Sequence, residues 1–281
     1  MRAFYNESVL TEAQRDRIEV VLVSPRNPLN IGAVARAMAN FGFARLAVVS
    51  AYEPHWREAR SAVGAPQLLN NARETATIAE AVADRTLVIG TGTLTYRKPE
   101  QPVVSLTELA PFVRRELDRG GKIAIVFGPE KHGLTRDDLS YCHMLVEIPT
   151  DHRQPSMNLG QAAAVCLYEL TARTNPDTVP SESDMNAFKK IDRTPDEEID
   201  APLRSIKSTS SGNLDILSQL IEEVMIAAAY SPRTMQAANR HSIRLLLRRL
   251  HLNSADNRRI LGLFRRILWR LRRAASRNVT N

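Results

Sequence analysis

The chain lacks several features by which large classes of protein are identified. It has only 2 cysteines, Cys142 and Cys166, both in apolar surroundings and without the spacing of metal ligands. This indicates a reduced, cytoplasmic protein without a metal site rather than a disulfide scaffold. No apolar run approaches the roughly 20 residues needed to span a bilayer. The N-terminal segment has no apolar core of the kind found in signal peptides, so we expect neither a membrane span nor a leader.

Two common nucleotide-binding signatures are also missing. The sequence contains neither Gly-x-Gly-x-x-Gly nor Gly-x-x-x-x-Gly-Lys-Ser/Thr. A Rossmann dinucleotide site and a P-loop phosphate site are therefore unsupported. Hydrophobic residues make up 43% and charged residues 25% of the chain, as in ordinary globular proteins. The 281 residues suffice for one medium-sized domain and a smaller appendage.

Positive charge is concentrated at one end of the chain. The net charge is +7, yet residues 240–281 hold 12 arginines against a single acidic residue, Asp256. Such a local arginine field attracts polyanions such as nucleic acids, with a strength that depends on salt. The alternative is a pair of solvated helices coated with arginine.

Short β-branched runs alternate with helical patterns over residues 1–173. Each run is apolar nearly throughout, as in strands buried on both faces. We expect strands at Ile18–Val23, Arg45–Val49, Thr86–Ile89, Lys122–Phe127 and Met144–Ile148. We expect helices at Ile31–Phe41, within 56–83, at Ser105–Asp118 and at Asn158–Thr171. The alternation predicts an α/β domain with a mostly parallel sheet.

The rest of the chain differs in composition. Residues 174–212 scatter prolines among Ser, Asp and Glu and predict a linker. Helical patterns return over residues 213–281, at Leu214–Ala229, His241–Leu250 and Arg258–Arg273. The last of these carries an apolar stripe with arginines on its other faces, so we expect a helical, basic region that binds nucleic acid.

Three separated segments each follow a predicted strand. Residues 26–36 include Asn30, which is suited to cap the next helix, and Arg36. Residues 127–135 hold two glycines that permit a loop able to wrap a ligand with backbone amides. Residues 148–158 form a polar loop that leads into another helix. Ligands of open α/β sheets bind at the carboxyl ends of the strands, although each segment alone also fits an ordinary turn or helix cap.

Together the three segments resemble the motifs of the SpoU branch of the SPOUT RNA methyltransferases. The first matches Asn-x-Gly-x-x-x-Arg at Asn30, Gly32 and Arg36. The second matches Phe-Gly-x-Glu-x-x-Gly-Leu over residues 127–134, and the third matches Ile-Pro followed by Ser-hydrophobe-Asn, which ends at residues 156–158. The C-terminal region is similar to the helical tail of TrmJ-type enzymes, which methylate the ribose of nucleotide 32 in the tRNA anticodon loop.

The resemblance implies a SPOUT fold with a trefoil knot and a homodimer that uses S-adenosylmethionine to methylate a ribose 2′-hydroxyl of tRNA. It implies catalytic roles for Arg36, Asn30, Glu130, Ser156 and Asn158. It implies cofactor contacts, largely through backbone groups, at Thr91, Gly92, Thr93, Gly128, Ile148, Pro155, Ser156 and Met157. We expect RNA contacts from Arg97, Arg244, Arg248 and Arg265. The chain departs from the family pattern of Thr-Ser-Ala-Arg before Arg97, and has Met157 where leucine is usual.

Three alternatives stay open at this point. The nearest is a ribosomal RNA ribose methyltransferase of the same superfamily. A second is an RNA-binding protein that has this fold but no activity. A third is a protein that lies on a membrane surface through the amphipathic segment Arg258–Arg273, although the near absence of lysine there favours RNA.

Overall fold

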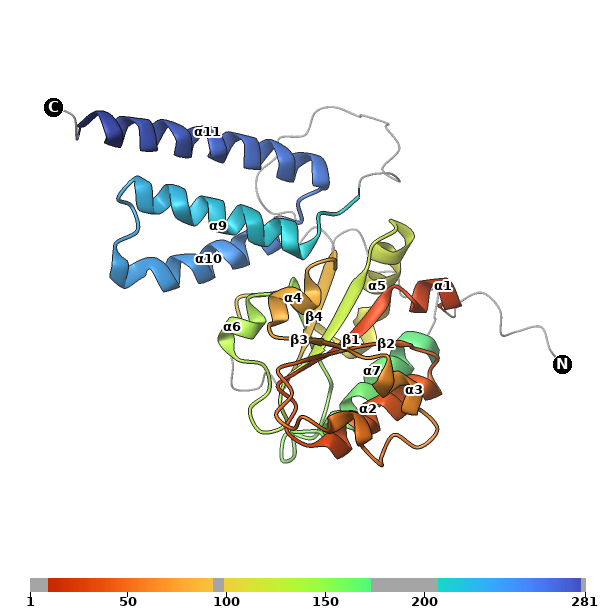
Figure 1. Cartoon of the computed structure of the whole chain (residues 1–281). Helices are drawn as coiled ribbons and strands as arrows, with labels where there is room; N and C mark the ends of the chain where they lie inside the picture. Colours follow the sequence, from red (N-terminus) through yellow and green to blue (C-terminus); the bar gives the residue numbers. More distant parts are fainter. Residues whose placement is uncertain (1–9, 93–98, 173–206, 279–281) are drawn as a thin grey trace.

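The computed structural model describes residues 10–92, 99–172 and 207–278. A 7-stranded, fully parallel sheet of order β3-β2-β1-β6-β4-β7-β5 forms its centre (Figure 1). The strands are β1 (Ile18–Val23), β2 (Arg45–Val49), β3 (Arg73–Thr75), β4 (Leu87–Thr91), β5 (Val103–Ser105), β6 (Ile123–Phe127) and β7 (Met144–Glu147). The predicted α/β class and the five predicted strands are confirmed, with ends that shift by at most two residues.

Helices cover both faces of this sheet and continue into a C-terminal layer. The helices that accompany the sheet are α1 (Glu12–Arg15), α2 (Pro28–Asn40), α3 (Pro66–Asn70), α4 (Ile78–Val82), α5 (Leu109–Asp118), α6 (Arg136–Leu139) and α7 (Leu159–Ala172). Short 3-10 turns are η1 (Trp56–Glu58), η2 (Leu106–Glu108) and η3 (Arg233–Met235). The C-terminal helices are α9 (Ser211–Ala227), α10 (Gln236–Arg249) and α11 (Ser254–Asn278).

Side chains alternate between two apolar cores along each buried strand. In β1, Val20 and Leu22 belong to the core on the α2, α5 and α7 face, whereas Val21 and Val23 belong to the core beneath α4 and α6. This alternation follows from the two-residue period of a strand. All six residues of β1 are buried and five of them are apolar, which is why its hydrophobic content predicted the strand. The sixth, Glu19, forms ion pairs with Arg73 and Arg85.

Two short strands were not predicted. β3 consists of Arg73, Glu74 and Thr75, whose side chains are exposed or half-buried, and β5 is also three residues long. Both strands lie at the edges of the sheet, where an apolar run is not required. The predicted helical region 56–83 is accordingly wrong in part, because η1, α3, β3 and α4 divide it.

The predicted linker ends earlier than expected. Ser211 and Gly212 do not belong to a linker, because they form the first turn of α9. The backbone N–H of Ser211 donates to the carbonyl of Arg85 at 2.8 Å, and that of Gly212 donates to the carbonyl of Ala83 at 2.9 Å. Both carbonyls lie just before β4, so the C-terminal layer is attached at the amino edge of the sheet. Residues 174–206 of the predicted linker lie outside the described residues.

The C-terminal layer consists of three helices with α9 in the middle. α10 and α11 each pack against α9 (Figure 1). Their shared apolar cluster holds Leu214, Leu217, Ile221 and Leu247. β7, late in the chain, lies between the earlier β4 and β5. The strand order does not by itself show how the chain is threaded, and the trefoil knot stays a prediction.

Candidate active site

The three sequence segments converge because their strands are neighbours. β1, β6, β4 and β7 lie side by side in the sheet and all run in the same direction. The loops that follow these four strands therefore meet at one edge, the carboxyl edge of the sheet. Residues 24–30, 91–92, 128–134 and 148–158 form this cluster of loops, which we call the carboxyl-edge site.

The first segment begins its helix differently from the prediction. The N-cap of α2 is Asn27, whose side-chain oxygen accepts a hydrogen bond from the backbone of Leu29 at 2.9 Å, and Pro28 occupies the first helical position. The expectation that Asn30 caps the helix is therefore wrong. Pro28 favours an early start because its fixed φ suits the first turn of a helix. Asn30 lies within that turn, and its side chain is free to serve another purpose.

Asn30 joins the other two segments through its side-chain amide. Its Nδ2 donates to Oε1 of Glu130 at 2.7 Å, and its Oδ1 accepts from Nδ2 of Asn158 at 3.0 Å. Asn158 also holds the start of α7, because its Oδ1 accepts from the backbone of Gly160 at 2.9 Å. The structure thus brings together three side chains from segments that are distant in the sequence, and we predicted all three to share a site.

The carboxylate of Glu130 is the electrostatic centre of this network. It also accepts backbone hydrogen bonds from Arg26 at 3.3 Å and from Asn27 at 3.4 Å. Burial by itself favours the protonated acid, but the donors from Asn30, Arg26 and Asn27 outweigh burial and hold the pKa of Glu130 below its ordinary value. The carboxylate is therefore charged at neutral pH. Sequence reasoning did not identify the two backbone donors, because main-chain groups leave no residue-specific signal.

We expect Glu130→Gln to lower the free energy of unfolding by about 1 kcal/mol at pH 7. This is less than a fully buried carboxylate would contribute, because solvent screens a half-buried charge. The neutral amide accepts fewer hydrogen bonds than the carboxylate does. Its N–H groups would also face the N–H donors of Arg26, Asn27 or Asn30, with which they cannot form hydrogen bonds. A lowered pKa contributes stability above the ordinary value of 4.5, and that stability is lost as pH falls below it. The difference between the proteins should therefore shrink in acid.

Chemical denaturation at pH 7 and about pH 3.5 measures this effect. Glu53→Gln, at an exposed glutamate, is the matched control and should change the free energy of unfolding very little at either pH. A difference between wild type and Glu130→Gln that stays constant with pH would refute a charge-dependent role.

The second segment needs its glycines for steric reasons. A Cβ on Gly128 would overlap the backbone nitrogen of Leu134, and Gly133 has a φ of +64°. Only glycine avoids the clash at the first position, and the second lies in the left-handed region that glycine adopts without penalty. The loop thus folds back on itself, as the sequence predicted, and its backbone is available to a ligand.

The predicted cofactor residues lie around this loop. Gly92 and Ser156 are exposed, and Ile148, Pro155 and Met157 are half-buried in the loops that follow β7. Thr91 differs, because its side chain is buried and its hydroxyl donates to the carbonyl of Val126 at 3.0 Å. Only its backbone is available to a ligand. Thr93 and Arg97 lie outside the described residues.

Arg36 lies near the middle of α2 and is exposed. Within the described part of the chain, its guanidinium makes no hydrogen bond or ion pair, and the side chains of Asn30 and Glu130 bind each other instead of holding it. Ser156 likewise makes no side-chain hydrogen bond to a described residue. Both side chains are therefore free to contact a ligand, and Ser156 lies within the carboxyl-edge site itself.

The small residues of the third segment serve packing within the chain. A Cβ on Gly160 would lie 2.7 Å from the Cβ of Ala33, so α7 and α2 approach closely at this point. The two helices that meet here, α2 and α7, belong to the same chain. This contact fixes the position of the first segment relative to the third.

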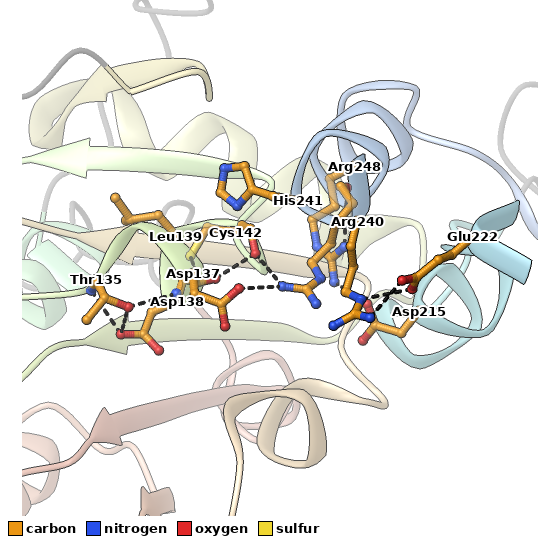
Figure 2. Close-up of polar contacts among 12 residues, drawn as sticks. Thr135, Asp137, Asp138, Leu139, Cys142, Asp215, Glu222, Arg240, His241 and Arg248 are labelled. Atoms are coloured by element: carbon orange, nitrogen blue, oxygen red, sulfur yellow. Dashed lines mark hydrogen bonds and ion pairs between the residues drawn. The ribbon is translucent and has the colours of Figure 1, made fainter. Parts of the chain in front are cut away.

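Two of the arginines expected to bind RNA lie in an internal interface. Arg248 is 1% exposed, and its guanidinium donates to Asp215 at 2.8 Å. Arg244 donates to Asp137 at 3.0 Å and to the hydroxyl of Ser140 at 2.7 Å. Figure 2 shows how Arg240 and Arg248 of α10 lie against Asp215 and Glu222 of α9.

Tyr141 completes this interface. The guanidinium carbons of Arg244 and Arg248 lie 4.2 Å and 5.3 Å from the centre of its ring. The structure therefore gives both arginines internal partners, because carboxylates and an aromatic ring from distant segments surround them. Arg265, by contrast, is exposed on α11 as expected.

The described parts of the chain hold neither a metal-ligand cluster nor a membrane-spanning helix. No group of three His, Cys, Asp or Glu side chains among these residues is arranged to hold a metal ion. None of the helices described is both long and apolar enough to cross a membrane.

Comparison with known proteins places this site in a family. Residues 17–168 match the SpoU rRNA Methylase family. The chain is 39% identical over 156 residues to the tRNA (cytidine/uridine/adenosine-2'-O-)-methyltransferase TrmJ of Pseudomonas aeruginosa, and the match covers 55% of this chain and 60% of that protein. It is also 39% identical over 156 residues to the tRNA (cytidine-2'-O-)-methyltransferase TrmJ of Methanocaldococcus jannaschii, with 54% and 66% covered. The matched region is thus less than two thirds of either relative.

The fold extends further than this sequence match. A crystal structure of TrmJ from Z. mobilis ZM4 superposes with a TM-score of 0.71 at 26% identity. The superposition covers 89% of this chain and 98% of that one, so it includes the C-terminal helices as well as the sheet. The SPOUT-type α/β fold with a helical C-terminal extension is confirmed.

Proposed function

Because the chain belongs to the SpoU rRNA Methylase family, we propose that it methylates a ribose 2′-hydroxyl of tRNA with S-adenosylmethionine as the donor. The observation that carries this proposal is the hydrogen-bonded set of Asn30, Glu130 and Asn158, which joins all three motifs at one edge of the sheet. The names of the similar proteins support tRNA over ribosomal RNA. The resemblance of the tail to TrmJ-type enzymes supports nucleotide 32 of the anticodon loop.

The loops at the carboxyl edge fit the proposed cofactor. Gly128 keeps residues 128–134 folded tightly, and Gly92 has no atom within 4 Å of the place where a Cβ would be, so backbone groups can approach a ligand there. Residues 155–157 would close the other side. When bound, S-adenosylmethionine supplies an activated methyl group on a positively charged sulfur. The chain's own task is to hold the ribose hydroxyl in line with that methyl group, and positioning of this kind lowers barriers by about 7–11 kcal/mol in good cases.

Arg36 is the residue we assign to the ribose. Its exposed guanidinium offers several donors in a fixed plane, which suits a hydroxyl oxygen and a neighbouring phosphate. Arginine stays protonated in almost all proteins, so orientation of the substrate is its principal role. Asn30, Glu130 and Asn158 keep α2 and the two ligand loops in fixed relative positions. Ser156, exposed in the last loop, would complete the pocket.

A homodimer is part of the proposal. Leu29 on α2 and Tyr168 on α7 are 55% and 51% exposed although both are large and apolar. A second copy packed on this face would cover them. The basic helix α11 belongs to the layer attached at the amino edge, opposite to the carboxyl-edge site of the same chain (Figure 1). An RNA that crosses both subunits would contact the carboxyl-edge site of one subunit and the arginines of α11 in the other.

The test is transfer of a labelled methyl group. Purified protein with labelled S-adenosylmethionine should methylate a ribose of a tRNA transcript and not a 23S rRNA fragment. Transfer to the rRNA fragment alone would favour the ribosomal alternative. No transfer to any tRNA would refute the proposal and favour a non-catalytic RNA-binding protein.

The exposed arginines of α11 should determine how tRNA binding depends on salt. The double variant Arg258→Gln, Arg265→Gln should bind tRNA more weakly. Its slope of log affinity against log salt should be shallower by about 0.7–0.9 for each phosphate that the variant no longer neutralises. Filter binding at several salt concentrations measures the slope. Lysine at the same two positions is the control, because it keeps the charge and should keep the slope; an unchanged slope in the glutamine variant would contradict the prediction.

A further inference from the structure

Trp269 on α11 is a half-exposed aromatic side chain in the most basic part of the chain. It is 43% exposed, whereas the other tryptophan, Trp56, is fully buried. The guanidinium carbons of three arginines surround its ring, at 4.6, 5.7 and 5.3 Å from the ring centre for Arg266, Arg270 and Arg273. We call these four residues the Trp269 cluster.

Packing of the helix does not explain the cluster. The side of α11 that faces α9 uses Ile260, Leu261 and Phe264, which pack on the apolar cluster of the layer. Leu268 is 6% exposed and also faces inward. Trp269 lies outside this apolar set and leaves much of its ring in contact with solvent. Packing against α9 therefore does not require an aromatic ring at position 269.

The charge of the cluster also lacks a partner within the described chain. Elsewhere on α11, Arg272 pairs with Glu223 at 2.8 Å and Arg259 pairs with Asp256 at 3.4 Å. Among the described residues, Arg266, Arg270 and Arg273 have no carboxylate partner, and all three lie against the tryptophan ring. Three positive charges held beside one exposed ring are complementary to a partner that has both anionic groups and aromatic faces.

We propose that Trp269 is a stacking platform for an unpaired base of bound RNA, with Arg266, Arg270 and Arg273 supplying contacts to the flanking phosphates. The inference rests on the proposed function, and it names the type of RNA that the tail recognises: single-stranded rather than duplex. Unpaired loop bases stack on aromatic side chains, and each base has a π-face whatever its identity. A base that stacks on the ring takes the place of a guanidinium, which then becomes free to bind a phosphate.

Tryptophan fluorescence tests the proposal directly, because Trp269 is the more exposed of the 2 tryptophans in the chain. In a Trp56→Phe background, a single-stranded RNA of about 10 nucleotides, within the site size of known single-strand binders, should quench the emission of Trp269. A duplex of the same length and sequence should quench it much less. If Trp56→Phe does not fold, the wild-type spectrum minus that of Trp269→Ala gives the same readout.

Binding of the same single-stranded RNA provides the second measurement. Trp269→Ala should weaken binding by about tenfold. Trp269→Phe should retain most of it, because phenylalanine keeps a stacking face. Leu263→Ala is the matched control, since Leu263 is 59% exposed on the same helix and has no aromatic ring; it should bind as wild type does.

The outcomes separate this inference from the proposed function. Unchanged binding by Trp269→Ala, or equal quenching by duplex RNA, overturns the stacking platform even if the wild type methylates tRNA. Quenching by anionic phosphatidylserine vesicles but not by RNA also overturns it, in favour of a membrane surface. Quenching by single-stranded RNA in a protein that methylates no tRNA supports the platform and refutes the proposed function alone.

Discussion

Arg36→Ala is expected to slow methyl transfer to tRNA by about a hundredfold or more, because misplacement of a reacting group by about 1 Å can cost that much. The exposed guanidinium has no partner among the described residues, so its removal should leave the fold unchanged. Binding of S-adenosylmethionine should also be unchanged, because the predicted cofactor loops follow β4, β6 and β7 and not α2. The loss should therefore fall on kcat rather than on cofactor affinity.

Single-turnover methylation and calorimetric titration with S-adenosylmethionine measure the two effects separately. Arg36→Lys keeps the charge but not the planar donor geometry, so it should recover only part of the rate. Asn40→Ala, at the exposed last residue of the same helix, is the control and should transfer methyl groups at the wild-type rate. A rate for Arg36→Ala within a few-fold of wild type would remove Arg36 from the active site.

Arg248→Ala should lower the free energy of unfolding by about 3–5 kcal/mol, the range found when one partner of a buried ion pair is removed. Arg248 is 1% exposed and binds Asp215 of α9 at 2.8 Å, so alanine leaves a carboxylate without its cation and a cavity beside Tyr141. Its neighbour Arg249 is exposed, and Arg249→Ala should change stability by no more than about 0.5 kcal/mol. The two substitutions are alike in chemistry and differ only in burial.

Urea denaturation of the full chain measures both free energies. Arg248→Met is informative as a third variant, because it fills most of the space without a charge. The Nε of Arg248 has no hydrogen-bond partner among the described residues, so methionine should cost less than alanine does. Equal stabilities for Arg248→Ala and Arg249→Ala would show that the ion pair between Arg248 and Asp215 contributes nothing to stability. A large loss of tRNA affinity in Arg248→Ala without any loss of stability would support its predicted role in RNA binding.

Several features of this protein follow from the sequence alone. The apolar runs of β1, β2, β4, β6 and β7 predicted the parallel sheet, because strands buried on both faces need apolar residues at nearly every position. The glycines at 128 and 133 predicted a tightly folded loop, because few other residues tolerate those positions. The three motifs predicted that Asn30, Glu130 and Asn158 share one site. The apolar runs and the glycines are local signals. The shared site was predictable because the three motifs are recognisable as a set.

The tertiary structure alone decided which polar groups meet. Asn27, not Asn30, caps α2, and this frees Asn30 to bind Glu130 and Asn158 at the carboxyl edge of the sheet. Arg248 looks in the sequence like any other arginine of the basic tail, yet α9 and Tyr141 enclose it. A polar side chain has no periodicity that reveals its partner, because the partner arrives from a distant segment only when the strands and helices have packed. The three segments of the carboxyl-edge site were thus determined by the sequence, whereas the hydrogen bonds that join them were determined by the order of the strands.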